Sequence, residues 1–69
     1  MTTKQLINMG LSYASISQRQ LAERLGWTPQ NLNNRIKTGR FTIEEWQQIA
    51  QTMGATFDVH IVFPDGKSI

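Results

Sequence analysis

The chain has 69 residues, no cysteine and a single histidine, and its seven Lys and Arg residues against five Asp and Glu residues give a net charge of +2. A chain this short makes one domain with a marginal core, because it buries only about 60% of the surface that it exposes when unfolded. The absence of cysteine, with His60 as the one histidine, excludes disulfides, thiolate metal sites and a histidine ligand set, so we expect no metal and no cofactor.

The first two predicted helices have clear start signals. The first begins at Thr2 or Thr3, since either can act as an N-cap. The residues expected to face its core side recur at helical spacing: Leu6, Met9 or Gly10, and Tyr13. The second opens with Ser17, and Gln20 three residues later gives the spacing of a capping box. Its apolar stripe consists of Leu21, Ala22 and Leu25. Gly26 can end it.

A third helix is predicted from Pro29 to Thr38, with Thr28 as its N-cap and Gly39 just beyond its end. Its apolar stripe consists only of Leu32 and Ile36, so we expect one narrow side of the helix to be buried and the rest to be exposed. Side-chain amides are unusual in a helix because they compete with the backbone for hydrogen bonds. This helix nevertheless contains four of them: Gln30, Asn31, Asn33 and Asn34.

A fourth helix is predicted to begin at Thr42, which has capping-box spacing with Glu45, and to end at Gly54. Its apolar face is wide enough to be the scaffold for the other helices. That face consists of Ile43, Trp46, Ile49, Ala50 and Met53. Residues 1–54 are therefore predicted to form the helical core.

After Gly54 the apolar period changes to two, which predicts a β-strand. The apolar face of this strand consists of Phe57, Val59, Ile61 and Phe63. A turn at Pro64-Asp65-Gly66 then predicts a β-hairpin over residues 55–69, with Phe63 paired to Lys67 and Ile61 to Ile69. The expected fold class is α+β, mostly α, with four helices followed by this hairpin in a single domain, residues 1–69.

The returning strand of this hairpin is too short to cover the first, so residues 56–60 keep a free row of backbone donors and acceptors. A second copy of the strand, running antiparallel, would pair that edge and make the protein a homodimer. The expected dimer interface is the apolar face: Phe57, Val59, Ile61 and Phe63. The alternative is a monomer whose hairpin covers its own helices.

Only residues 26–28 separate the second and third helices, which is the length and glycine placement of a helix-turn-helix. In that motif the second helix enters the DNA major groove, where side-chain amides match the N6 donor and N7 acceptor of adenine. Residues 18–40 carry five Lys and Arg against Glu23, whereas residues 41–69 have a net charge of −3. The alternatives are a polar helix built of poor helix formers and an ordinary solvated basic face.

The stretches "ISQRQLAERLGWTPQNLNNRIKTGRF" and "EEWQQIAQTMGATF" resemble the Cro and lambda-repressor type (Xre-like) of helix-turn-helix protein, in the short versions encoded by phages and bacterial mobile elements. The resemblance covers residues 16–55 and rests on these residues: Ser17, Gln18, Leu21, Ala22, Leu25, Gly26, Leu32, Ile49, Ala50, Met53 and Gly54. It implies contacts to DNA bases from Gln30, Asn33 and Asn34. With the local charge, it implies contacts to the DNA backbone from Gln18, Arg19, Thr28, Asn31, Lys37 and Arg40.

Two residues depart from the family pattern. Pro29 stands where several relatives place a base-reading glutamine, which shifts readout onto Gln30 and the asparagines. Arg35 replaces a residue that is commonly apolar or aromatic, and its length allows two roles, lying along the core or reaching a phosphate. Trp27, in the turn, is expected to cover the junction of the second and third helices rather than to contact DNA.

These patterns predict a sequence-specific regulator of transcription that binds double-stranded DNA, with repression as the expected role. The alternative is an antitoxin-like interaction module whose C-terminal strand captures a partner protein. Asp58 and His60 lie two residues apart, but no nucleophile, metal set or phosphate loop accompanies them, so we expect no enzyme and no catalytic residues. No apolar run has the length of a membrane span or a signal peptide, which favours a cytoplasmic protein.

Overall fold

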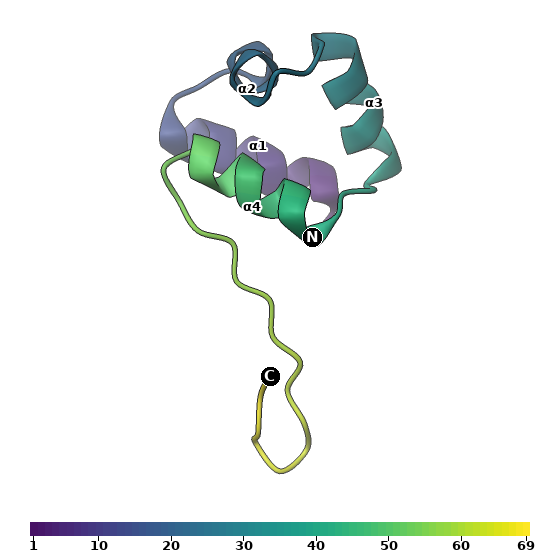
Figure 1. Ribbon diagram of the computed structural model, residues 1–69, viewed down its shortest axis with the longest axis vertical. Helices are drawn as coiled ribbons and strands as arrows, with labels where there is room; N and C mark the ends of the chain where they lie inside the picture. The colour runs from purple at the N-terminus through teal and green to yellow at the C-terminus, as the bar shows by residue number, and fades with distance from the viewer.

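A computed structural model describes residues 1–69, which fold into four helices followed by an extended segment (Figure 1). The helices are α1 (Thr3–Ala14), α2 (Gln18–Leu25), α3 (Pro29–Thr38) and α4 (Ile43–Thr52). Helix α2 packs on α4, and α3 packs on both α1 and α2. The four predicted helices are confirmed, including both ends of the third. None of them is long and apolar enough to cross a membrane.

Side-chain caps fix where each helix begins. Helices α1, α2 and α4 each begin with a capping box, in which the N-cap hydroxyl and a Gln or Glu side chain three residues later each bind the other residue's backbone N–H. The three pairs are Thr2 with Gln5, Ser17 with Gln20, and Thr42 with Glu45. Helix α3 has a single cap, because only the Thr28 Oγ1 accepts a backbone N–H, that of Asn31, at 3.1 Å. Such caps matter here because helices of 8 to 12 residues are marginal by themselves.

The core is small and entirely apolar. Its seven buried residues are Ile7, Leu11, Leu21, Ala22, Leu32, Ile36 and Ile49. Partly buried residues packed against it include both tryptophans, Trp27 and Trp46, and Phe41. The sequence patterns of α2 and α3 therefore predicted the correct inner faces. The predicted face of α4 was correct except for Ile43, which is 57% exposed.

The predicted inner face of α1 was wrong. Tyr13 is 95% exposed and Met9 59% exposed, while Ile7 and Leu11 lie in the core. Both sets recur at helical spacing, so periodicity alone does not choose between them. The packing of α1 on α3 decides the matter, since it buries Ile7 and Leu11. Of the predicted residues, only Gly10 makes a close approach, to the side chain of Met53 at the end of α4.

The predicted C-terminal β-hairpin is not supported as an element. Residues 55–69, here called the C-terminal arm, contain no strand and only one isolated antiparallel bridge, between Val62 and Ser68. Backbone hydrogen bonds join Ile61 to Ile69 at 2.9 and 3.0 Å and Phe63 to Lys67 at 2.7 Å, which are the expected pairs, but they are too few to define strands. Residues 56–60 run extended and make no backbone–backbone hydrogen bond. The fold is therefore helical with an arm, rather than α+β.

The arm projects away from the helices (Figure 1), and the molecule extends 43 Å along its longest axis but only 23 and 20 Å across it. Of the expected dimer-interface residues, Phe57 packs on Trp46 with ring centroids 5.3 Å apart. Val59, Ile61 and Phe63 are 45 to 59% exposed. This single chain gives no support to pairing between two copies of the strand.

Candidate nucleic-acid interface

Helices α2 and α3 form a rigid pair joined by a tight turn. Helix α2 ends at Gly26, whose φ of 77° is in the left-handed region that favours glycine. The Trp27 N–H then donates to the Ala22 carbonyl at 2.9 Å, which closes the turn. Leu21 and Leu32, one from each helix, are fully buried. This is the geometry of a helix-turn-helix, with α3 in the position of the recognition helix.

The buried side of α3 determines which side chains point outward. At about 100° per residue, the direction opposite Leu32 and Ile36 is occupied by Gln30, Asn34 and Lys37, one turn apart along the helix. All three are exposed. Of the predicted base-contacting residues, Gln30 and Asn34 thus share one outward face, which we call the reading face.

The third predicted base-contacting residue, Asn33, lies on the flank of α3. It is exposed, but helix geometry turns it about 100° away from Asn34 and toward the edge of the buried stripe. Asn31 lies on the opposite flank, exposed, with its backbone N–H bound to the Thr28 cap. These positions fit the edge of a groove better than its centre.

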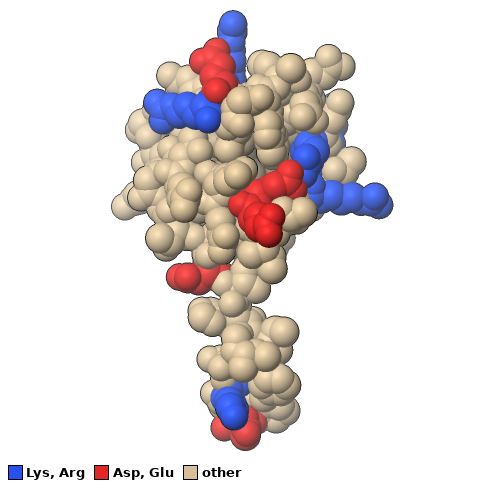
Figure 2. All heavy atoms as spheres, in the orientation of Figure 1, with Lys and Arg blue, Asp and Glu red and all other residues tan.

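The predicted backbone-contacting side chains surround the reading face. All are exposed except Gln18, which is half-buried at the first position of α2. Arg19 pairs with Glu23 at 3.5 Å, but both side chains are more than 60% exposed, so the pair contributes little and can be exchanged for a phosphate. Basic side chains stand out from the α2 side of the body and again at the far end of α3 (Figure 2). Lys37 lies in the last turn of α3, and Arg40 follows the end of that helix.

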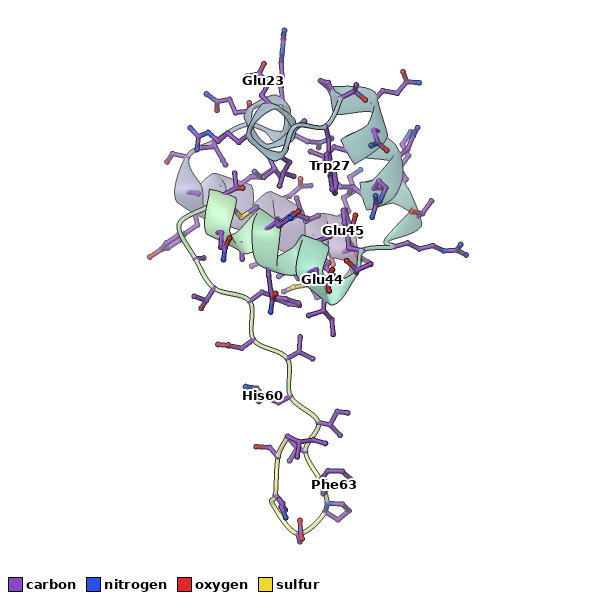
Figure 3. The ribbon with its side chains drawn as sticks, in the orientation of Figure 1. Glu23, Trp27, Glu44, Glu45, His60 and Phe63 are labelled. Atoms are coloured by element: carbon purple, nitrogen blue, oxygen red, sulfur yellow. The ribbon has the colours of Figure 1, made fainter.

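Arg35 lies over two aromatic rings that pack against the core, which is one of the two roles that its length allows. Its Nη2 donates to the Oε2 of Glu45, and its Nε donates to the carbonyl of Arg40 at 3.3 Å. Its Cζ lies 4.9 Å from the ring centroid of Trp27 and 5.3 Å from that of Phe41, and these two rings are nearly parallel. Figure 3 shows Trp27 directed from the turn toward the start of α4, where Glu45 lies. We call this group the Arg35 cluster: Trp27, Arg35, Arg40, Phe41 and Glu45.

The cluster changes the electrostatics that the sequence implied. The backbone N–H of Thr42 and then the Arg35 guanidinium bind the Glu45 carboxylate, and both lower its pKa. Because Glu45 pairs with Arg35 and Glu23 pairs with Arg19, the Lys and Arg residues of segment 18–40 that have no acidic partner are Arg24, Lys37 and Arg40. The sequence did not reveal this pairing, since residues ten positions apart in two different helices follow no periodic pattern.

Three other features of the surface lie outside the helix-turn-helix. No group of three or more His, Cys, Asp and Glu side chains is placed to hold a metal ion. An apolar hollow of about 170 Å³ lies between α1 and α4, away from α3, and Leu6, Trp46, Met53 and Phe57 are among its lining residues. Asp58 and His60 are exposed on the arm (Figure 3).

Residues 6–38 match the model of a family described as winged helix-turn-helix DNA-binding. The match covers most of α1, all of α2 and all of α3, just under half of the chain. It ends before α4. Comparison with curated proteins found no match, and comparison with solved structures found none. Sequence, geometry and family match agree that this chain contains a helix-turn-helix DNA-binding domain.

Proposed function

We propose that the protein is a sequence-specific transcription regulator of the Cro and lambda-repressor type, and that it acts as a repressor on double-stranded DNA. The observation that carries this proposal is the reading face. Gln30 and Asn34 stand one turn apart on the outward side of α3, opposite the buried Leu32 and Ile36. Each amide offers a donor and an acceptor, and a bidentate pair with adenine contributes about 1 to 3 kcal/mol of discrimination.

The charge distribution supports binding of DNA over another polyanion. One cation, Lys37, stands beside the two amides on the outward side of α3. Contacts of the cations to the DNA backbone would position the helix while the neutral amides read bases. Repression is the simpler form of regulation because a bound protein can act by occupying a promoter. We propose that the protein acts in the cytoplasm, where bacterial DNA is found.

Selection of bound sequences from a random duplex library tests the proposal. Gln30→Ala and Asn34→Ala should each relax preference at one or two base positions and weaken the selected site about 5- to 150-fold. Lys37→Ala, next to them on the helix, is the matched control and should weaken all duplexes alike. The wild-type log affinity should fall with log salt with a slope of about −3 to −4 if three or four phosphates are neutralised. Undetectable duplex binding at low salt would refute the proposal.

We further propose that two copies associate through the C-terminal arm. Residues 56–60 have unpaired backbone groups, and Val59 and Ile61 expose apolar side chains. Ile61 and Phe63 direct their backbone groups toward the return segment, so residues 58, 60 and 62 present theirs on the opposite, free edge. Natural proteins seldom leave such an edge uncovered.

Repulsion between carboxylates limits the registers open to this association. A two-fold axis at Val59 would set Asp58 opposite the partner subunit's His60, twice, and Phe57 opposite the partner subunit's Ile61. An axis at Asp58 would oppose two carboxylates instead. Sedimentation at micromolar concentration should give a dimer for the wild type and a monomer for Val59→Lys, with Ser68→Lys as the control that stays dimeric. A monomeric wild type would exclude the association.

A second candidate function follows from the same exposed arm. An antitoxin-like protein would use Val59, Ile61 and Phe63 to bind a different protein instead of a second copy. In that case the wild type sediments as a monomer, and Val59→Lys leaves its DNA affinity unchanged. Loss of DNA affinity together with loss of the dimer would instead favour the homodimeric regulator.

A further inference from the structure

Arg35 lies on the flank of the recognition helix that faces α4, away from the reading face. Each of its contacts reaches a different segment of the chain. Trp27 belongs to the turn before α3, Arg40 and Phe41 to the loop after it, and Glu45 to the first turn of α4. One side chain therefore ties both ends of α3 to the fourth helix.

Direct packing between the helices connects α3 only weakly to α4. Helix α3 contributes only Leu32 and Ile36 to the core and packs on α1 and α2, whereas α4 packs mainly on α2. Two residues on one narrow stripe resist translation of a helix better than rotation about its axis. The Arg35 cluster holds the flank of α3 that would move if the helix rotated.

The chemistry of the cluster requires arginine. The planar guanidinium donates through Nε and Nη2 to two acceptors while its face covers two aromatic rings. Glu45 is also fixed at its other oxygen, because its Oε1 accepts the Thr42 N–H at 2.8 Å. Arg35 is thus held by an acceptor that is itself part of the α4 cap, and a lysine ammonium could not make both donations and the stacking together.

We infer that Arg35 is a positioning residue for DNA recognition, which orients the reading face of α3 through Glu45 and the two aromatic rings and does not itself contact a phosphate. This inference rests on the proposed function. It separates Arg35 from Lys37 and Arg40, whose charges are free. Removal of Arg35 should alter which bases are read, whereas removal of a phosphate contact should alter all affinities together.

The test compares Arg35→Gln with Lys37→Gln, each measured on the selected duplex and on an unrelated duplex over a range of salt. We expect Arg35→Gln to weaken the selected duplex at least tenfold, to change the unrelated duplex less than threefold, and to leave the salt slope unchanged. Lys37→Gln should weaken both duplexes alike and reduce the slope by about one. Arg35→Lys should fail to restore selectivity, because the charge alone is not sufficient.

A uniform loss with Arg35→Gln and a slope reduced by about one would overturn the inference and make Arg35 a phosphate contact. Unchanged selectivity would overturn it as well. If circular dichroism shows that Arg35→Gln is unfolded, Glu45→Gln replaces it, since glutamine keeps the capping-box hydrogen bond and removes only the charged partner. That variant should lose selectivity in the same direction. Failure of the wild type to bind any duplex refutes the proposed function, whereas wild-type binding with fully selective variants refutes this inference alone.

Discussion

Replacement of Thr28 by alanine should destabilise the recognition helix more than its exposed position suggests. The Thr28 Oγ1 accepts the Asn31 N–H at 3.1 Å, and α3 lacks the reciprocal side-chain hydrogen bond that the other three helices have at their start. Loss of such a cap costs about 1 kcal/mol, within a range of about 0.5 to 2. For a domain of this size, 1 kcal/mol corresponds to a fall in Tm of about 4 to 8 °C.

Thermal unfolding followed by circular dichroism measures this effect, with Thr28→Ser as the control. Serine keeps the hydroxyl at the same position, so its Tm should stay close to that of the wild type. The hydroxyl hydrogen of Thr28 is free to donate to a phosphate, and this contact releases no counterion. Below the Tm of both proteins, Thr28→Ala should therefore weaken all duplexes without changing the salt slope. An unchanged Tm for Thr28→Ala, or an equal fall for Thr28→Ser, would refute the capping argument.

Three further predictions concern stability and are checked by thermal unfolding. Gly10→Ala should raise the Tm slightly, because alanine gains about 1 kcal/mol of helix propensity and the contact at 2.8 Å is with the flexible end of Met53, whereas a lowered Tm would show that Met53 cannot move. Gly39→Ala should lower the Tm, because its φ is 70° and the new Cβ would lie 3.1 Å from the Thr3 Oγ1; an unchanged Tm would contradict this. The folded-state pKa of Glu45 is lowered from its ordinary value of 4.5. The ionised carboxylate therefore stabilises the fold above pH 4.5, and this stabilisation is lost as the pH falls through the folded pKa. The Tm difference between the wild type and Glu45→Gln should shrink from about pH 7 to about pH 3.

Local signals explain why the helices could be predicted. A threonine or serine cap binds a backbone N–H only three residues away, so positions such as Ser17 and Thr42 are informative without any knowledge of the fold. Both ends of α3 were predictable for the same reason, since Thr28 precedes Pro29 and Gly39 follows the last turn. The residues on its reading face then follow from the position of Leu32 and Ile36.

The features that sequence reasoning missed depend on contacts between distant segments. Two apolar stripes on α1 have equally good periodicity, and only the packing of α1 on α3 selects the inner one, with Ile7 and Leu11. Alternation along residues 56–63 shows which side chains share a face, but strand formation needs a backbone partner. In this segment only Ile61 and Phe63 have one. The role of Arg35 depends on Glu45 and on aromatic rings from two other segments.

The small core has a consequence for how specificity is maintained. With seven buried residues, of which α3 supplies two, hydrophobic packing alone cannot specify the rotation of a recognition helix. Polar groups at the edges of α3 also fix its orientation, through a single cap at one end and the Arg35 cluster along its flank. The Arg35–Glu45 pair of this cluster is partly exposed, so, unlike the cap, it contributes little to the free energy of unfolding. Selectivity should therefore be lost at substitutions that barely change the Tm, and residues that do not touch DNA should be among those that set the sequence it binds.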